Sequence, residues 1–472
     1  MNSAWNEHFL LQTPLGRRLY HEQAAMLPII DFHSHLSARD LAADRVFANL
    51  TELWIAPDPY KHRALRHLGV PESLITGSSS DYEKFLAWAA SLPRLLGNPL
   101  HQWSDLELRH TFGITQALDT SSAEVVWNRT LDLLTRPSHS ARALLALAPV
   151  ACVCTSDRLL DDLADHRHLA GKLNATRVLP SIRADDALAV QSRDFPSWVQ
   201  ALGERTRVSI NGLDDFLAAI EVRLEDFAVH GCVLSDHALD MFDYATTPAS
   251  EADRAFRRRL EGRALEPGEV RALRSHLLAH LGTSYGRRGW AMQLHLGAQR
   301  DTSSRLRERV GPAGGYATIG QPANIGALCR FFDDLEREGV LPRTVIYSLH
   351  PGDYAPLAAL TGSFTEEGVA GKVQCGPAWW FNDHVLGIRH HLDAISHYGF
   401  LSSFIGMTTD SRSLVSMTRH EYFRRILCDY LGEQAAAGRL PDDFALLSDC
   451  VRRIAYDNAR HWLRLPLPDL RS

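Results

Sequence analysis

The chain has 472 residues, of which 45% are hydrophobic and 22% are charged, and its net charge is -6. This is the composition of a globular protein with enough apolar residues for a large core. Acidic and basic residues are interspersed, so nothing in the charge pattern suggests a surface built for nucleic acid or for an anionic membrane. No apolar stretch is long enough to span a bilayer, and the first residues lack the pattern of a secretory signal. The seven cysteines are scattered, several of them in apolar runs, so we expect reduced, buried thiols and a cytoplasmic protein.

Short apolar runs recur along the chain, and most intervals between them are long enough for a helix. This alternation predicts a parallel sheet covered by helices on both faces. Eight repeats favour a closed (β/α)8 barrel over an open doubly wound sheet, and no glycine-rich dinucleotide motif follows the first run. The predicted strands are residues 27–33, 150–155, 177–182, 228–235, 291–295, 344–349, 372–376 and 403–407.

The first interval is much longer than the others and is rich in tryptophan, leucine and helix-forming residues. We interpret residues 36–147 as a helical insertion after the first strand, on the face of the barrel where active sites form. Residues 1–35 then contain an N-terminal helix and the first strand, and residues 148–472 contain the rest of the barrel. A second enlargement, residues 246–289, follows the fourth strand. The predicted fold is therefore an α/β fold, a distorted (β/α)8 TIM-type barrel with a helical insertion.

The first predicted strand ends in Ile29-Ile-Asp-Phe-His-Ser-His-Leu36. Residues two apart on a strand face the same side, so His33 and His35 present their imidazoles together. Two such rings at the mouth of a strand are half of a divalent metal site. A second His-x-His, at His166 and His168, lies in a charged helical stretch where the helical period separates the rings. Only the first pair therefore predicts a metal.

Two later predicted strands end in residue types that also bind metals. The fifth ends at His295, and the eighth is followed by Asp410 and Arg412. A lone histidine in a strand is more often a core residue, and a lone aspartate after a strand often caps a helix. The strand ends of a barrel converge on one site, however, so their joint occurrence favours the functional interpretation. The predicted ligands of one divalent metal ion, with zinc preferred, are His33, His35, His295 and Asp410.

This set of strand-end residues resembles the amidohydrolase superfamily of barrels, and longer motifs resemble the uronate (glucuronate) isomerase family. The two most specific motifs are Thr409-Asp-Ser-Arg-Ser413 and Arg419-His-Glu-Tyr-Phe-Arg-Arg425. Others are Asn49-Leu-Thr-Glu-Leu-Trp54, Ser235-Asp-His-Ala-Leu-Asp240, Gln293-Leu-His-Leu-Gly297 and Trp379-Trp-Phe-Asn-Asp383. The resemblance implies interconversion of D-glucuronate with D-fructuronate and of D-galacturonate with D-tagaturonate, by proton transfer between C2 and C1 through an enediol.

Such a reaction needs a base at C2, stabilisation of the enediolate and a hold on the remote carboxylate. The resemblance implies that Asp410 moves a hydroxyl proton during ring opening and that Tyr60, in the insertion, lies near C2. An ordinary phenol is a poor base at neutral pH, so Tyr60 would need Arg412 or the metal close by. The predicted catalytic residues are Asp410, Tyr60, Arg412 and His295.

A second group of residues is predicted to bind the substrate. Arg183, which ends the third predicted strand, is a candidate for a bidentate hold on the uronate carboxylate, although it is equally interpreted as a surface arginine. Trp379 and Trp380 either form a wall for the sugar ring or pack in the core. The predicted substrate-binding residues are Arg183, Arg412, Trp379, Trp380 and His237. Asp236 and His237 follow the fourth predicted strand. The resemblance to the amidohydrolase superfamily implies that a bridging lysine or another carboxylate often stands in this region when two metals are bound. No lysine stands here, which favours one metal over two.

The chain departs from the common family pattern at several positions, which bear on substrate preference. Pro59 and His62 stand where a histidine and a tryptophan are common, and His350 stands where an asparagine is common. Two alternatives remain open: a metal-dependent hydrolase that activates water, and a carbohydrate-binding protein without catalysis. Retention of Tyr60 with Asp410 and Arg412 argues against the second. We expect a small-molecule hexuronate as the ligand, a homo-oligomeric state, and no nucleic-acid or membrane partner.

Overall fold

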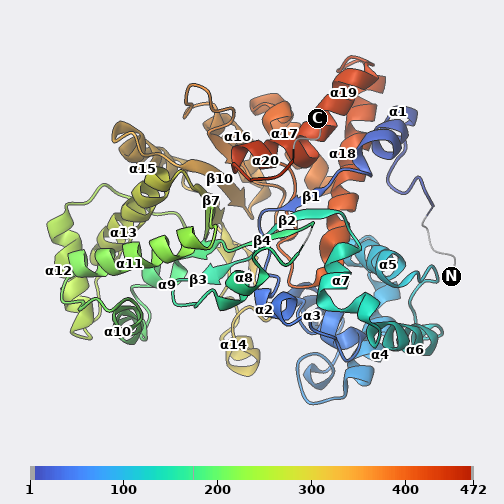
Figure 1. Ribbon diagram of the computed structural model, residues 1–472, viewed down its shortest axis with the longest axis horizontal. Helices are drawn as coiled ribbons and strands as arrows, with labels where there is room; N and C mark the ends of the chain where they lie inside the picture. Colours follow the sequence, from blue (N-terminus) through green and yellow to red (C-terminus); the bar gives the residue numbers. More distant parts are fainter. Residues whose placement is uncertain (1–5, 174, 469–472) are drawn as a thin grey trace.

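The central feature of the molecule is a curved parallel sheet whose strands follow one another in chain order (Figure 1). The computed structural model describes residues 6–173 and 175–468. Neighbouring barrel strands pair in parallel. Every residue of β7, the strand at the fifth barrel position, is buried, as expected where helices cover both faces of a sheet. The strands are β1 (Ile29–Asp31), β2 (Val150–Cys154), β3 (Asp157–Arg158), β4 (Arg177–Leu179), β5 (Ile182–Arg183), β6 (Leu234–Leu239), β7 (Ala291–Leu296), β10 (Arg343–Ser348) and β11 (Val373–Cys375).

The second and third strand positions are each divided into two pieces, β2 with β3 and β4 with β5. The hydrogen bonds nevertheless continue across the division. The amide of Thr155 donates to the carbonyl of Leu179 at 3.0 Å, and the amide of Ser181 donates to the carbonyl of Thr155 at 3.1 Å. The three-stranded sheet β1-β2-β4 and the six-stranded sheet that ends in β3 are therefore one continuous surface.

The predicted eighth strand, residues 403–407, was wrong as a strand. Its start is the short 3-10 helix η7 (Leu401–Ser403), and Gly406 has a φ of 93°, outside the strand region. A side chain at Gly406 would clash with the carbonyl of Ile454. Residues 404–410 still fill the gap between β11 and β1, because the amide of Ile405 donates to the side chain of Gln374 and the amide of Asp410 donates to the carbonyl of His33. The predicted barrel is confirmed, with a distorted closure.

The predicted strand at residues 228–235 was also misplaced. Helix α11 (Leu213–Val229) continues through its first two residues, and β6 begins only at Leu234. Gly231, with a φ of 82°, lies in the turn between them. The apolar run therefore contained the end of a helix, a turn and the start of a strand.

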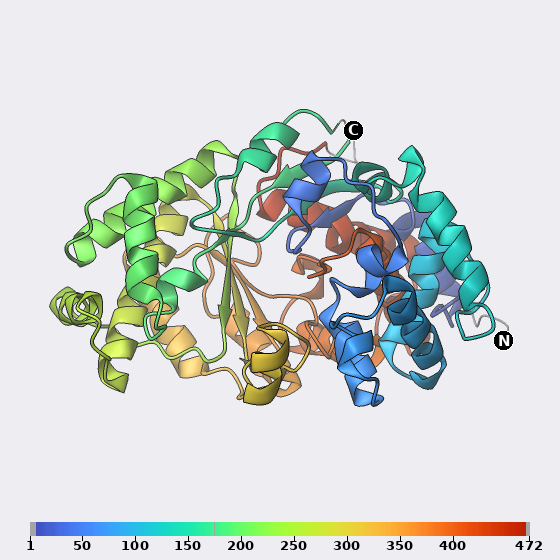
Figure 2. The same ribbon diagram turned by 90° about the horizontal axis from the view of Figure 1, so that it is seen from below.

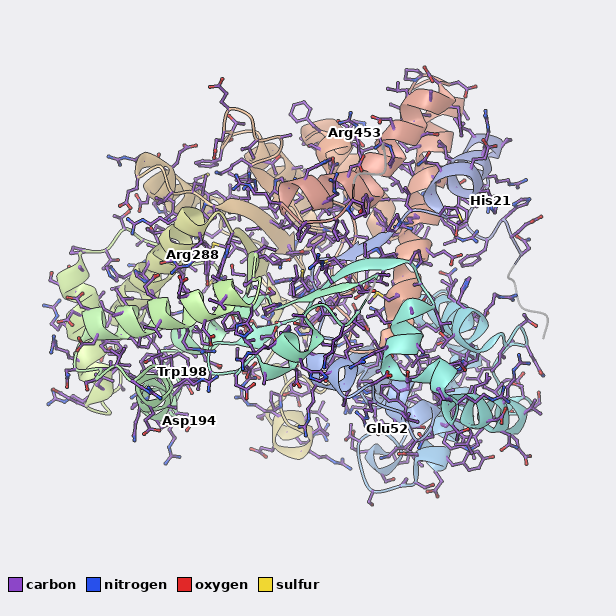
Figure 3. The ribbon with its side chains drawn as sticks, viewed as in Figure 1. His21, Glu52, Asp194, Trp198, Arg288 and Arg453 are labelled. Carbon is purple, nitrogen blue, oxygen red and sulfur yellow. The ribbon has the colours of Figure 1, made fainter. Side chains whose placement is uncertain are left out.

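Short helices joined by turns occupy the long interval between β1 and β2. They gather on one side of the strands in both views, where the insertion residue Glu52 is labelled in Figure 3 (Figures 1, 2 and 3). Local sequence sets several boundaries: Ser80 and Glu83 form a capping box at the start of α4, and Gly113 ends α5 in the left-handed conformation. The elements are α2 (Ala38–Ala42), η2 (Thr51–Ile55), α3 (Pro59–His67), η3 (Glu72–Leu74), α4 (Asp81–Ser91), η4 (Leu92–Arg94), α5 (Pro99–Phe112), α6 (Ala123–Leu134), η5 (Pro137–His139) and α7 (Ala141–Ala146).

The helices on the opposite side belong to the middle of the chain, including the second enlargement after β6. Asp194 and Trp198, labelled in Figure 3, mark this end of the molecule at α10, whereas Arg453 and His21 lie with the terminal helices. The elements on the opposite side are α9 (Asp185–Leu188), α10 (Phe195–Thr206), α12 (Ala249–Leu260), α13 (Pro267–Arg288) and α15 (Ile325–Arg337). Two other helices of the middle of the chain, α8 (Ala164–Leu169), which packs against α2, and α14 (Ser304–Val310), lie nearer the centre of Figure 1. The antiparallel pair β8 (Ala298–Gln299) and β9 (Thr318–Ile319) also belongs to this part of the chain.

The terminal segments pack together, with α1 against α18 and α19. They comprise α1 (Pro14–Leu19), η1 (Tyr20–Ala24), η6 (Pro351–Asp353), α16 (Tyr354–Thr361), α17 (Val385–Tyr398), η8 (Leu414–Met417), α18 (Thr418–Ala436), α19 (Phe444–Arg452), η9 (Arg453–Asp457) and α20 (Asn458–Trp462). Within the described residues, every helix is too short or too polar to cross a membrane. The seven cysteines are all free, and most are buried.

Candidate functional site

A cavity of about 1080 Å³ lies at the carboxyl ends of the barrel strands. His33 and His295 line it from the barrel, and Tyr60 lines it from α3 of the insertion. Residues 379–381 after β11 and residues 410–413, which begin at the end of the closing segment (residues 404–410), complete the inner wall, and residues 312–317 close the side next to α3. Arg63 on α3 donates to the carbonyl of Ala317 at 2.6 Å, which ties the insertion to the loop of residues 312–317 at the edge of the cavity.

Asp410 brings the two histidines of the first strand together. Its Oδ1 lies 3.2 Å from Nε2 of His33 and 3.0 Å from Nε2 of His35. Asp410 itself has a φ of 48°, a left-handed conformation that is uncommon for a residue other than glycine. Burial acts to raise the pKa of Asp410, but hydrogen bonds from the two histidines outweigh it and hold the pKa well below its usual range.

His295 belongs to the same group, and it brings Asp236 with it. Nδ1 of His295 lies 3.0 Å from Oδ1 of Asp236, and its ring stacks on Tyr347 with the ring centres 4.1 Å apart. The rings of His295 and His33 are 4.4 Å apart. Burial lowers the pKa of His295 to about 4, so this imidazole is neutral at neutral pH, the form that binds metals.

These residues fit a divalent metal ion. The potential ligand atoms within each of two overlapping sets, His33 with His35 and Asp410, and His33 with Asp236 and His295, all lie within 4.8 Å of one another. Within the described part of the chain, Nε2 of His295 and Nδ1 of His33 are buried without a hydrogen-bond partner. A buried imidazole nitrogen without a partner is costly unless something else binds it. The nitrogen and oxygen donors are those that zinc and similar ions prefer.

The two tryptophans of residues 379–383 hold Asp410 from the other side. The indole N–H groups of Trp379 and Trp380 both donate to Oδ2 of Asp410, the first at 2.7 Å. Both rings line the cavity, and Trp379 lies 4.8 Å from the ring of His295. The sequence is compatible with a wall for the sugar ring or with packing in the core; in the structure both rings line the cavity and both contact Asp410.

Tyr60 lies near the start of α3, which begins with the N-cap Asp58 and with Pro59 in the first turn. Its hydroxyl donates to Oδ2 of Asp383 at 2.9 Å. Burial and the charge of Asp383 raise the pKa of the phenol well above its usual value. The charged group over its ring is Arg419, at 5.6 Å, where Arg412 was expected, and the hydrogen-bond partner of the hydroxyl is Asp383.

The two candidate arginines differ in how they are held. Arg183 is engaged: its Nε donates to Asp185 at 2.7 Å, and its Nη1 lies 3.4 Å from Asp236. Arg412 lines the cavity with an exposed side chain, and among the described residues its guanidinium makes no hydrogen bond or ion pair. Arg412 is therefore the more available of the two for an anionic ligand.

His237, a predicted substrate-binding residue, is fully buried and is not part of the cavity wall within the described residues. Its ring packs 5.7 Å from that of Tyr285, because the side chains of β6 alternate and Asp236 takes the inward position. His350, one of the departures from the family pattern, has a structural contact: it is the N-cap of η6, where its Nδ1 accepts from the amide of Gly352. The second His-x-His is helical, with His166 buried and His168 exposed.

Three residues of this region were absent from the predicted site: Asp236, Asp383 and Arg419. Asp236 stands in the strand-four motif beside His237, and the pleat of β6 was the feature that could have separated the two. Asp383 and Arg419 each lie inside a motif quoted for the family resemblance. Their proximity to Tyr60 depends on tertiary contacts, which no local pattern contains.

Residues 1–463 match the family described as glucuronate isomerase. The uronate isomerase of Salmonella arizonae is 43% identical over 469 residues, which cover 98% of this chain and 100% of that protein. The uronate isomerase of Bacillus pumilus is 41% identical over 464 residues, covering 98% and 97%. The crystal structure of uronate isomerase from Thermotoga maritima superimposes with a TM-score of 0.92 at 31% identity, covering 98% of this chain and 100% of that one. The chain therefore belongs to the glucuronate (uronate) isomerase family.

Proposed function

We propose that this chain interconverts D-glucuronate with D-fructuronate and D-galacturonate with D-tagaturonate, as an aldose–ketose isomerase, and that the cavity at the strand ends is its active site. Membership of the family supports the reaction. One structural observation carries the assignment to this cavity: Asp410, which joins His33 to His35, faces the same space as Tyr60 and Arg412.

The first proposed step is opening of the sugar ring, in which a hydroxyl proton must leave. Asp410 is the proposed acceptor because it lines the cavity and its carboxylate is ionised at neutral pH. The indole N–H groups of Trp379 and Trp380 fix the carboxylate from the side opposite the histidines. This geometry directs Oδ1 towards the first strand.

The second proposed requirement is a metal ion, and we propose zinc held by His33, His35, Asp410 and His295. When bound there, it would polarise the oxygens at C1 and C2 and so favour loss of the C2 proton. The neutral imidazole of His295 and the ionised Asp410 are the protonation states that such binding needs. Asp236 would orient His295 through its contact with Nδ1.

The substrate carboxylate is assigned to Arg412 in preference to Arg183. Both carboxylates that contact Arg183 compete with a ligand for its donors, whereas Arg412 has no competitor among the described residues. A guanidinium binds a carboxylate through two parallel hydrogen bonds, which also fixes the orientation of the ligand. Bound in this way, the sugar acid would present its C1–C2 end to Asp410 and Tyr60.

Incubation of metal-replete protein with D-glucuronate or D-galacturonate in D₂O, followed by NMR, tests the proposal. Appearance of the ketouronate supports isomerisation, and deuterium in the product supports proton transfer over a hydride shift. Absence of turnover with both uronates contradicts the proposed function. Hydrolysis of an amide or lactone by a protein inactive on both uronates would identify a hydrolase instead.

A further inference from the structure

A buried carboxylate lies directly behind Tyr60. Asp383 is 7% exposed, and its Oδ2 accepts the hydroxyl of Tyr60 at 2.9 Å. Its Oδ1 is buried and, within the described chain, has no hydrogen-bond partner. Buried carboxylate oxygens normally have partners, so an unpartnered one needs an explanation. Asp383 is separated from the cavity by the phenol ring, and it is not one of the lining residues that the structure describes.

The charged and titratable neighbours of Asp383 come from several elements. Arg419 faces it from α18, while its guanidinium lies over Trp103 at 4.1 Å and donates to the carbonyl of Thr409. The remaining groups that interact with its charge are Tyr60 from α3, Tyr354 from α16, Tyr422 from α18 and Asp410 from the closing segment. Burial raises the pKa of Asp383 to about 6, against the opposing effects of Arg419 and of the Tyr60 hydrogen bond.

This environment makes Tyr60 unsuitable as a base by itself. A phenolate beside the carboxylate of Asp383 would place two negative charges together, and the raised pKa of Tyr60 reflects this repulsion together with burial. The phenol instead stays protonated and donates a hydrogen bond to Asp383. A lone pair of the same phenol oxygen then remains free to accept another proton. A hydroxyl with a carboxylate acceptor behind it can pass a proton on without becoming ionised.

We propose that Asp383 is the proton acceptor behind Tyr60 in the isomerisation, with the phenol as the relay between it and C2 of the sugar. The C2–H bond breaks, and its electron pair forms the C1=C2 bond of the enediolate as the C1 oxygen takes the negative charge. The C2 proton goes to Oη of Tyr60 while the phenol's own proton goes to Oδ2 of Asp383. Within the enediolate the proton of the C2 hydroxyl passes to the C1 oxygen, which moves the negative charge to the C2 oxygen. Reversal of the relay then delivers the proton from Oη of Tyr60 to C1 as Asp383 returns its proton to the phenol, and the C2 oxygen becomes the carbonyl of the ketose. The inference rests on the proposed function, and in it Asp383 is a positioning residue that acts through Tyr60.

The five residues 379–383 supply the geometry for such a relay. Trp379 and Trp380 hold Asp410, while Asp383 holds Tyr60, so one short segment fixes both proton-moving groups. Phe381 between them has a φ of 62° and packs against the ring of Tyr60 with the ring centres 6.3 Å apart. A non-glycine residue in this conformation is held by its surroundings, which is common at functional sites.

The test compares the substitutions Asp383→Asn and Asp383→Glu with a matched control, Asp334→Asn. Asp334 also accepts a tyrosine hydroxyl, from Tyr244 at 2.8 Å, but it lies outside the cavity. We expect Asp383→Asn to lower kcat on D-glucuronate by about 100-fold or more, with KM changed by no more than about threefold. Asp383→Glu should recover at least about tenfold of this loss, and Asp334→Asn should leave kcat unchanged.

The pH profile separates a relay from a structural contact. Asp383 accepts a proton only when ionised, so the wild-type kcat/KM should fall as the pH drops below about 6. Asp383→Asn should lose this acidic limb, and Tyr60→Phe combined with Asp383→Asn should be no slower than Tyr60→Phe alone.

An acidic limb retained in Asp383→Asn, or a kcat of Asp383→Asn within a few-fold of wild type, overturns the relay. If Asp383→Asn does not fold, a flat wild-type profile down to about pH 5 overturns it. Lack of wild-type turnover contradicts the proposed function itself, whereas an active wild type with an active Asp383→Asn contradicts only the relay.

Discussion

The two sides of the cavity are built in different ways. On the barrel side, His33, Asp236 and His295 lie on strands or at their ends, where the parallel ladder fixes their positions. On the insertion side, Tyr60 and Asp383 come from a helix and a loop that are 323 residues apart in the chain. The first group is positioned by backbone hydrogen bonds, and the second mainly by contacts between side chains.

This difference has a consequence for how each side tolerates change. Replacing a proposed metal ligand on the barrel side should alter the chemistry but leave the parallel ladder that carries it. Replacing a buried partner on the insertion side removes one of the few contacts that place Tyr60. We therefore expect chemical effects without loss of stability on the barrel side, and linked effects on stability and activity on the insertion side.

The largest expected effect is on the barrel side. Asp410→Asn should lower kcat by roughly 1,000-fold or more, because an amide cannot accept the hydroxyl proton at neutral pH. The amide can still accept the indole N–H groups of Trp379 and Trp380, so the melting temperature should change little. Steady-state kinetics on D-glucuronate and a thermal melt measure the two quantities. Near-normal turnover would remove Asp410 from the mechanism.

The next effect tests the insertion side through a buried lysine. Lys61 is 1% exposed, and its Nζ donates to Asp58 at 2.6 Å and lies 3.8 Å from Glu107. Lys61→Met leaves these carboxylates buried without their cation, which should reduce the free energy of unfolding by about 3–5 kcal/mol. Urea denaturation measures the loss, with Lys84→Met on α4 as the half-buried control. Activity should fall as well, because Asp58 caps the helix that carries Tyr60.

If Lys61→Met were as stable as Lys84→Met, the buried ion cluster would not hold the insertion in place. If it lost stability but kept full activity, the position of Tyr60 would not depend on the cap of α3. Either outcome would contradict the contrast between the two sides.

The same contrast explains how far the sequence could predict the site. The proximity of His33 and His35 could be predicted, because side chains two residues apart on a strand face the same side. The proximity of His295 and Asp410 to them could be predicted, because the ends of barrel strands converge. The contact between Tyr60 and Asp383 could not be predicted, since it depends on how a helix of the insertion meets the loop after β11.

The error at residues 403–407 has a similar origin, because the conformation of Gly406 is set by the carbonyl of Ile454 and not by its apolar neighbours. His237 stands one position from Asp236 on β6, so it lies on the other face of that strand, away from the cavity wall.

A smaller effect is expected at Arg412, where we propose that the substrate carboxylate is bound. Arg412→Gln should raise KM for D-glucuronate by about 10- to 100-fold, because one charge-assisted bidentate contact is lost. Arg307→Gln is the control, since Arg307 lines the outer cavity but is paired with Asp301. Initial-rate measurements over a range of substrate concentrations give both constants. An unchanged KM in Arg412→Gln together with a raised KM in an Arg183 variant would move the carboxylate to Arg183.

The smallest expected effect concerns the closure of the barrel, where the two modes of positioning meet. Asp31 at the end of β1 accepts the amide of Thr409 at 2.8 Å and its hydroxyl at 2.6 Å. Thr409→Val keeps the amide bond to Asp31 but removes the hydroxyl bond to Asp31 and the weaker bond that this hydroxyl accepts from the amide of Ser411 at 3.3 Å, so we expect a loss of about 1–2 kcal/mol in the free energy of unfolding. Thr344→Val in β10 is the control, because its buried hydroxyl donates to a neutral carbonyl instead. Since Thr409 precedes Asp410, kcat should fall a few-fold in Thr409→Val and stay constant in Thr344→Val. Equal kcat values in the two variants would mean that the backbone bonds at residues 409–411 suffice to place Asp410, and that side-chain contacts position only the insertion side.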